Sequence, residues 1–172
     1  MNDAQRDVLE VDVVFVGGGP AGLAGALRLT QLVAERNAAA AAGSGEPPLG
    51  EVSIAVLEKA SEIGAHGISG CILDPRALRE LVPDYREKNA PLESDVTGDD
   101  LYYFTKSGAI RFPMLPPPLQ NHGNHIVSLG DFEKWLGGLV EAAGAYVLPN
   151  MAAVEGLFED GQMVGVRTGD KG

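Results

Sequence analysis

Cysteine is nearly absent from this sequence, and so are long apolar runs and clusters of positive charge. The single cysteine among 172 residues, Cys71, excludes an intramolecular disulfide framework and most metal sites built from cysteines alone, which fits a reducing compartment. No stretch approaches the roughly 18–20 consecutive apolar residues of a transmembrane helix. The 13 Lys and Arg residues are scattered among 24 Asp and Glu residues, so a net charge of −11 argues against nucleic-acid binding.

The composition indicates a globular chain with many turns. Hydrophobic residues make up 45% of the sequence, and its 23 glycines and 11 prolines predict numerous loops. The length allows one ordinary domain or an incomplete piece of a larger one. Residues 1–7 are polar and acidic and resemble neither a signal peptide nor a transit peptide, so we expect a cytoplasmic start.

The first sixty residues predict a strand, a helix and a second, parallel strand. Residues 11–16 are a short β-branched run typical of a buried strand, and residues 20–36 then switch to helical spacing. Residues 52–57 predict the second buried strand. Residues 37–50 are a low-complexity insertion, whose alanines can prolong the helix by a turn and whose remainder from Gly43 we expect to be exposed loop. Together these segments form a βαβ unit with a right-handed crossover.

The remaining residues predict two short helices, two β-hairpins and a third parallel strand. We expect helices over 75–82 and 128–143 with Asp74 and Ser128 at their caps, hairpins over 101–112 and 154–167, a strand at 145–148, and irregular chain over 83–100 and 113–124. The fold class is therefore α/β, a Rossmann-like domain with a parallel sheet and β-hairpin insertions that is incomplete in this chain. Residues 1–172 are expected to form one incomplete domain of this kind, with an inserted loop and hairpin region at 65–125.

A glycine-rich turn joins the first strand to the first helix. Its six residues, Gly17-Gly18-Gly19-Pro20-Ala21-Gly22, match the pattern G-x-G-x-x-G. In such a turn Gly17 permits the tight bend, Gly19 lets the backbone approach a diphosphate, and Gly22 allows close packing of helix on strand. The diphosphate would rest on the free N–H groups at the positive end of the helix dipole. The alternative is an ordinary strand-to-helix turn.

A carboxylate at the end of the second strand fits a dinucleotide site. Glu58 lies 36 residues beyond Gly22, whereas about 20 is usual, and removing the insertion restores nearly the usual spacing. We expect Glu58 to accept hydrogen bonds from the adenosine ribose and to repel a 2′-phosphate. The alternative is a solvated charge.

The residues after Glu58 favour FAD over a nicotinamide cofactor. A nicotinamide dehydrogenase usually continues with further βα units, but here residues 63–70 form a second glycine-rich stretch. Glycines clustered at this point suit a loop that runs along an extended cofactor with its backbone close to it.

These segments resemble known flavoproteins. Residues 13–23 resemble the FAD fingerprint of the glutathione-reductase-type family. Residues 57–59 with 64–70, 73–78 and 121–130 resemble electron transfer flavoprotein–ubiquinone oxidoreductase, and the resemblance covers nearly the whole chain outside the insertion. Gly18 and Gly25 depart from the pattern, because alanine is commoner at both positions.

The resemblance implies an FAD-dependent oxidoreductase, an electron-transferring-flavoprotein dehydrogenase that passes electrons from reduced electron transfer flavoprotein to ubiquinone. It also implies a [4Fe–4S] cluster, whose cysteine ligands lie in the carboxyl-terminal part of the family and are absent here, so this chain alone is not expected to transfer electrons. No side chain is expected to be catalytic and none to bind a metal. The resemblance assigns FAD binding to Gly17, Gly18, Gly19, Pro20, Ala21, Gly22, Glu58, Lys59, Ser69 and Gly70.

The resemblance further implies a peripheral protein on the inner face of a bacterial inner membrane, in contact with the lipid through the segment from Ala65 to Asp84. The apolar surface would come from Ile68, Ile72, Leu73, Leu78, Leu81 and Val82, with Arg76, Arg79 and Arg86 at the headgroups. The alternative is a helix packed in the core with an exposed basic edge.

Two other functions stay open. One is a different FAD-dependent reductase or hydroxylase of the same fold, which would need a hydride donor, and the other is a non-catalytic truncated fragment. His66, His122 and His125 lack the further ligands of a zinc site. Cys71 is expected to be a buried, inert thiol, and Trp135 to cover a neighbouring element.

Overall fold

Three parallel strands form the sheet at the centre of the molecule. The computed structural model describes residues 7–68 and 70–169. Strand β1 (Val13–Val16) and strand β2 (Ile54–Leu57) pair in parallel, and β8 (Tyr146–Leu148) pairs in parallel on the other side of β2. The order β1-β2-β8 leaves β2 in the middle, so all four of its residues are buried. The predicted βαβ unit and third parallel strand are confirmed.

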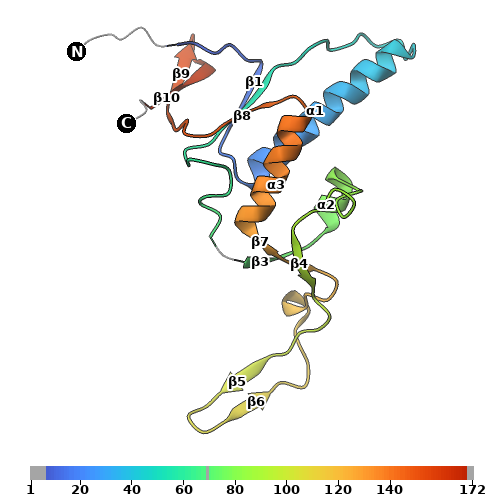
Figure 1. Cartoon of the computed structure of the whole chain (residues 1–172), viewed down its shortest axis with the longest axis vertical. Helices are drawn as coiled ribbons and strands as arrows, with labels where there is room; N and C mark the ends of the chain where they lie inside the picture. The colour runs from blue at the N-terminus through green and yellow to red at the C-terminus, as the bar shows by residue number, and fades with distance from the viewer. Residues whose placement is uncertain (1–6, 69, 170–172) are drawn as a thin grey trace, which may run out of the picture.

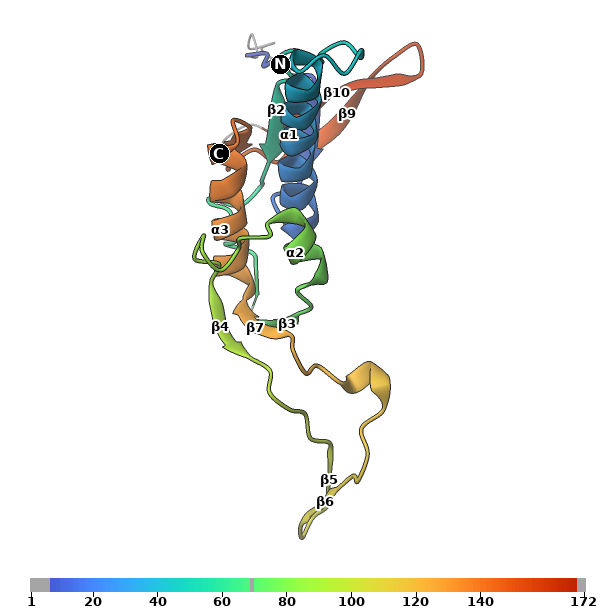
Figure 2. The same cartoon turned by 90° about the vertical axis from the view of Figure 1, so that its right-hand side faces the viewer.

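Two helices lie side by side along this sheet (Figures 1 and 2). Helix α1 (Pro20–Ala41) is five residues longer than the predicted span to residue 36, because the alanine run of the insertion is helical. Alanine has the highest helix propensity of all residues, which explains the extension. The rest of the insertion is loop as expected, and the Asn37 amide fastens it by donating to the Gly50 carbonyl and accepting from the Leu49 N–H.

Helix α3 (Leu129–Ala142) begins at the predicted cap, where the Ser128 hydroxyl accepts a hydrogen bond from the Asp131 N–H. The core lies between the two helices and the sheet. Its fully buried side chains include Leu23 of α1, Val56 of β2, and Leu136 and Val140 of α3. Burying each such side chain contributes roughly 1.5–3 kcal/mol, so this packing holds the α1 N-terminus in place.

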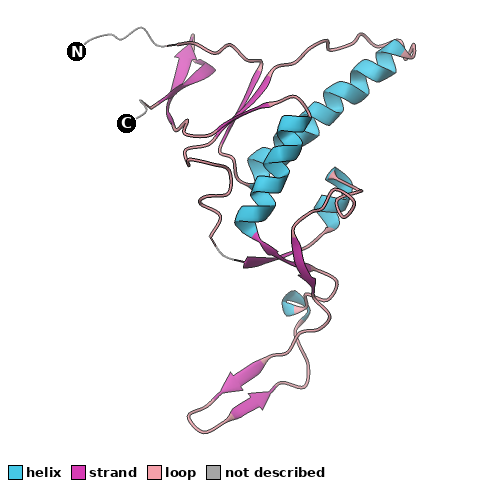
Figure 3. Ribbon diagram, viewed as in Figure 1, coloured by secondary structure: helices cyan, strands magenta, loops and turns pink. Residues whose placement is uncertain are grey.

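A second, antiparallel sheet was missed by the sequence analysis. It consists of β3 (Gly70–Leu73), β7 (His125–Ser128) and β4 (Leu92–Asp95), in the order β3-β7-β4 (Figure 3). The expectation that residues 83–100 are wholly irregular is therefore wrong. Each strand has only four residues and pairs with chain tens of residues away, so no local pattern reveals it.

Helix α2 (Arg76–Leu81) corrects part of the membrane prediction. It is slightly shorter than expected, and the Asp74 carboxylate accepts a hydrogen bond from the Arg76 N–H at its start. Leu78 and Val82 are buried in the core cluster, so for these two side chains the packed-helix alternative is correct. Ile68 and Ile72 remain exposed.

Two hairpins project from this body, as predicted. Strands β5 (Tyr102–Phe104) and β6 (Ala109–Arg111) form the tip of a long arm, whose returning, proline-rich chain contains one turn of 3₁₀ helix, η1 (Pro117–Leu119) (Figure 2). Strands β9 (Ala153–Glu159) and β10 (Gln162–Thr168) pair at the opposite end of the molecule. Within the described residues, no helix has the length and hydropathy needed to cross a membrane.

Candidate functional site

The glycine turn places an open helix end beside the end of β2. Gly17 has a φ of +109°, a conformation that side-chain-bearing residues rarely adopt, and its N–H donates to the Leu57 carbonyl at 2.8 Å. Helix α1 starts three residues later at Pro20, with Gly19 as its N-cap. Gly19 has no side chain to bond the first N–H groups of the helix, so these remain free to bind an anion.

The individual glycines of the turn are required for two different reasons. A Cβ on Gly22 would overlap the Gly17 carbonyl oxygen, so the close approach of helix and turn depends on its absence. A Cβ on Gly17 or Gly19 would meet nothing within 4 Å, so open space lies in front of the turn. The turn is therefore tightly packed at Gly22 and open at Gly17 and Gly19, an arrangement that leaves room for a bound diphosphate.

The two glycines that depart from the family pattern are explained by their neighbours. A Cβ on Gly18 would lie 2.5 Å from the Ile63 side chain and 3.1 Å from Glu58. A Cβ on Gly25 would lie 2.8 Å from the Phe15 ring. In this chain larger side chains occupy the volume that an alanine methyl group would need.

Glu58 is held firmly next to the turn. One carboxylate oxygen accepts a hydrogen bond from the Gly18 N–H at 2.8 Å, and the other accepts one from the Ala60 N–H at 2.8 Å. Its side chain is only 12% exposed, which excludes the alternative of a merely solvated charge. Each oxygen keeps a lone pair for a further donor, such as a ribose hydroxyl.

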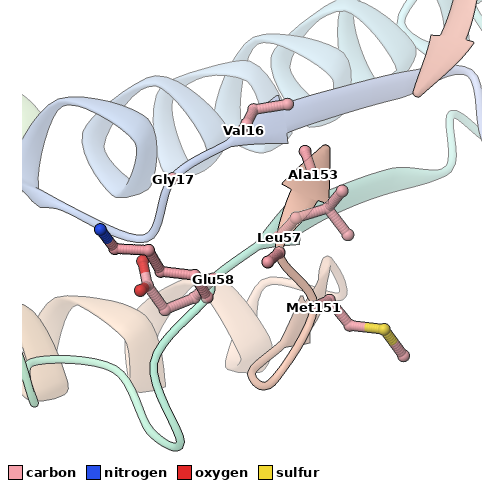
Figure 4. A pocket seen from close by; sticks show the side chains of 8 residues that line it. Val16, Gly17, Leu57, Glu58, Met151 and Ala153 are labelled. Atoms are coloured by element: carbon pink, nitrogen blue, oxygen red, sulfur yellow. The ribbon is translucent and has the colours of Figure 1, made fainter. Parts of the chain in front are cut away.

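A cavity of about 160 Å³ opens beside Glu58 (Figure 4). Its walls come from the ends of β1 and β2 and from the chain that follows β8. The lining residues are Val16, Gly17, Leu57, Glu58, Lys59, Met151, Ala152 and Ala153. The last three were not predicted, because they reach the site only through pairing with β2, and the Met151 N–H donates to the Glu58 carbonyl at 2.8 Å.

A smaller cavity of about 90 Å³ lies on the other side of Glu58, against the glycine turn. It is lined by Gly18, Gly19, Glu58, Gly64, His66 and Glu133. Glu133 of α3 is 7% exposed, and burial, followed by the negative charge of Glu58, raises the pKa of its carboxyl above the ordinary value. Sequence reasoning missed Glu133, although its position beside Phe132 and three residues before Leu136 on the inward side of a predicted helix was a usable signal.

Three glycines bring the loop after β2 onto the start of α3. Gly64 has a φ of +84°, and a Cβ at this position would overlap the Gly130 carbonyl oxygen. A Cβ on Gly67 would lie 2.8 Å from both the Gly130 Cα and a Glu133 carboxylate oxygen. The second glycine-rich stretch thus lies against α3 and closes one side of the smaller cavity.

The predicted FAD residues are only partly brought together. Gly17, Gly18, Gly19, Glu58 and Lys59 line the cavities, and Pro20, Ala21 and Gly22 continue into the first turn of α1. Gly70 pairs with Ser128 in the antiparallel sheet and lines neither cavity. The prediction for Ser69 lies outside the described residues.

The histidines and the cysteine have other surroundings. His125 is buried, with its Nδ1 2.6 Å from an Asp95 carboxylate oxygen and its Nε2 3.1 Å from the Tyr85 hydroxyl. A hydrogen bond from Arg86, and then one from His125, lowers the pKa of Asp95. Cys71 is half-buried rather than fully buried. In residues 7–68 and 70–169, no group of three or more His, Cys, Asp or Glu side chains is placed to hold a metal.

Trp135 packs as predicted against a neighbouring element. Its indole N–H donates to the Lys88 carbonyl at 2.8 Å, and its ring lies 5.6 Å from that of Phe132, centroid to centroid. It therefore fastens the chain after α2 to helix α3, away from both cavities.

The chain is closely similar to electron transfer flavoprotein–ubiquinone oxidoreductases. It is 46% identical over 170 residues to the mitochondrial protein of Bos taurus, 45% to that of Caenorhabditis elegans and 44% to the protein of Pseudomonas aeruginosa. Each match covers 98–99% of this chain. The matched region is the amino-terminal part of these relatives.

The resemblance to electron transfer flavoprotein–ubiquinone oxidoreductase is thereby confirmed over nearly the whole chain. The chain spans little more than a quarter of the length of these curated relatives, 26% of the bovine protein and 29% of the Pseudomonas protein. No family model matches the chain.

Solved structures with the same fold are found among flavin-dependent enzymes. A flavin-dependent brominase superimposes with a TM-score of 0.62 at 15% identity, over 94% of this chain and 34% of that one. A geranylgeranyl bacteriochlorophyll reductase-like protein of Thermoplasma acidophilum gives 0.59 at 21% identity, over 92% and 34%. At these identities the likeness shows the fold alone, and the predicted Rossmann-like class is confirmed.

Proposed function

We propose that this chain binds FAD at the glycine turn and forms the FAD-binding part of an oxidoreductase that passes electrons from reduced electron transfer flavoprotein to ubiquinone. The observation that carries the proposal is the 2.8 Å hydrogen bond from the Gly18 N–H to the Glu58 carboxylate. It fixes a ribose acceptor directly beside the open end of α1. The identity of the substrates follows from the names of the relatives that the chain matches.

Each part of the site then has a defined task. The free N–H groups at the start of α1 hold the diphosphate, and Glu58 accepts hydrogen bonds from the adenosine ribose. Leu57 and the segment from Met151 to Ala153 offer an apolar wall for the adenine, with Lys59 at its edge. When bound, FAD supplies the redox chemistry, and the side chains described here bind and orient it.

The [4Fe–4S] cluster of the resembled family does not fit this chain. Such a cluster takes cysteine thiolates as ligands, and the sequence holds only Cys71. We therefore assign the cluster no residue here, and we propose that the complete electron path needs sequence beyond these 172 residues.

We also propose that the protein is peripheral on the inner face of a bacterial inner membrane. Within the segment from Ala65 to Asp84, Ile68 and Ile72 are 87% and 49% exposed and can face lipid. Co-sedimentation with liposomes should fall when both become Asp, whereas a control change of the exposed Glu80 to Asp should leave it unchanged. If the double variant co-sediments with liposomes as well as the wild type does, this segment does not contact lipid.

Gly19→Ala tests the FAD proposal most directly. A methyl group at Gly19 meets open space in this fold, so the variant should fold normally, but the methyl group would stand where the diphosphate must approach. We expect FAD affinity, measured by flavin fluorescence quenching, to fall roughly tenfold or more, which is about 1.4 kcal/mol or more. Gly98→Ala, which also meets open space but in the arm, is the matched control and should bind like the wild type.

The same titration separates the alternatives. A wild-type chain that ignores added FAD would support the reading as a non-catalytic fragment. A chain that binds FAD and whose bound flavin is reduced by NADH or NADPH would support a different reductase or hydroxylase of this fold.

A further inference from the structure

Glu133 is a buried carboxyl group without a partner inside the candidate site. It is 7% exposed, and no hydrogen bond or ion pair of the described residues involves it. An ionised carboxylate in such a place is costly, since burial removes part of its water and no donor of the described residues replaces it. The neighbouring Lys134 does not compensate it, because its ammonium group lies 3.2 Å from a Glu62 carboxylate oxygen.

The carboxyl group of Glu133 faces the glycine turn across the smaller cavity. The groups that share this cavity are the backbone of Gly18 and Gly19, the carboxylate of Glu58 at the end of β2, and the His66 imidazole from the loop after it. No lysine or arginine is among the described residues that line it. Among the described residues that line this cavity, Glu58 supplies the negative charge that acts on Glu133.

The position of the Glu133 side chain is fixed by tight backbone packing. One of its carboxylate oxygens would lie only 2.8 Å from a Cβ on Gly67, so the loop rests directly on it. Gly130, one turn earlier on α3, closes the same contact. The carboxyl group is thereby held at the cavity.

Burial and the Glu58 charge favour the protonated form of Glu133 by raising its pKa. A protonated carboxyl group carries an O–H that can donate a hydrogen bond. An ionised one would instead place a second negative charge beside the turn and would repel an anionic ligand. The protonation state of Glu133 thus decides whether the cavity attracts or repels a diphosphate.

We propose that Glu133, in its protonated form, donates a hydrogen bond to a diphosphate oxygen of the nucleotide bound at the glycine turn. The inference rests on the proposed function, because FAD supplies that diphosphate. Glu133 keeps its proton when FAD binds. FAD binding therefore weakens as the pH rises, because the ionised form of Glu133 cannot donate this hydrogen bond. His66 also lines the cavity; its side chain is 63% exposed, and its Nδ1 lies 3.9 Å from a Glu58 carboxylate oxygen.

FAD titrations of the full chain between pH 6 and pH 8.5 test this inference. For the wild type we expect the Kd to rise with pH, with a limit of about tenfold per pH unit for one proton. Glu133→Gln keeps an N–H donor and lacks the charge, so it should bind FAD with little pH dependence and more tightly than the wild type at pH 8.5. Glu133→Leu lacks the donor and should bind more weakly than Glu133→Gln throughout. Thermal unfolding of each variant verifies that it is folded.

His66→Gln is the control for the histidine that shares the smaller cavity with Glu133. It should retain the part of the pH dependence that comes from Glu133. The inference is overturned if the wild type binds FAD with a constant Kd, if Glu133→Gln keeps the wild-type slope, or if the slope disappears in His66→Gln alone. Absence of FAD binding in both the wild type and Glu133→Gln would instead overturn the proposed function, and the inference with it.

Discussion

The central sheet and the arm contain similar apolar residues but are held in different ways. In the central sheet β2 is buried along its whole length by its two neighbours and by helices α1 and α3. In the arm, strands β5 and β6 pair only with each other, and Tyr103 and Phe104 are 61% and 76% exposed. An isolated two-stranded hairpin is marginally stable at best in water. The candidate site, which needs a fixed geometry, therefore lies in the region where several elements pack against one another.

The site is rigid because the strands that carry it are buried. Glu58 directly follows Leu57 of β2, and Gly17 directly follows Val16 of β1, so both are positioned by the parallel pairing of these strands. The arm has no comparable convergence of elements. Substitutions in the two regions should therefore differ strongly in cost.

The largest effect is expected at the base of the glycine turn. Gly22→Ala would place a methyl group on the Gly17 carbonyl oxygen, and the backbone cannot yield without moving β1 or α1. We expect the free energy of unfolding in urea to fall by roughly 2–4 kcal/mol. Gly138→Ala is the control, since its added Cβ meets open space on α3, and it should be neutral or stabilising. Equal stability of the Gly22 variant would show that the turn is not tightly packed.

Two truncations test whether the central sheet and the arm differ in their contribution to stability. Leu23→Ala removes a fully buried side chain of α1 and should cost roughly 2–5 kcal/mol in the free energy of unfolding. Phe104→Ala removes a larger side chain that is 76% exposed at the tip of the arm and should change it by at most about 0.5 kcal/mol. A comparable loss from both, measured by the same urea denaturation, would mean that the arm contributes to the cooperative unit.

The last prediction concerns the pH dependence that Glu133 gives to the chain without nucleotide. Because its pKa is raised in the folded state, the folded chain binds more protons than the unfolded chain, so this group's contribution to stability falls as the pH rises above the ordinary value near 4.5. Glu133→Gln should therefore stabilise the chain at pH 7–8, as measured by urea denaturation. The gain should vanish near pH 4. A stability difference that does not depend on pH would contradict the assignment.

Local signals predicted a large part of the fold. The β-branched runs gave β1 and β2, the glycine pattern gave the turn, and Ser128 gave the start of α3. Both hairpins were also predicted, since each has a short polar turn between apolar strands. These features depend on residues only a few positions apart, so a linear pattern contains them.

The missed features depend on pairing over long distances. Strand β3 exists because Gly70 to Leu73 meet β7 more than fifty residues later, and four residues are too few for a periodic signal. Met151 reaches the cavity because its N–H bonds the Glu58 carbonyl. Glu133 lies on the inward side of a predicted helix, but its contact with the loop after β2 is made only in the folded chain. The pairing of β3 and the contact of Met151 have no signature near their own positions.

By itself the sequence determined the glycine turn, the acid that ends the second strand and the open helix end between them, because φ preferences, propensities and helix dipoles act within a few residues. Only the tertiary structure decided which groups surround that turn. It buried Leu78 and Val82, which the sequence allowed to face lipid, and it placed the unpaired carboxyl group of Glu133 against Gly18 and Gly19. The physical reason is that burial and charge are set by whatever the folded chain brings together, whatever the separation along it.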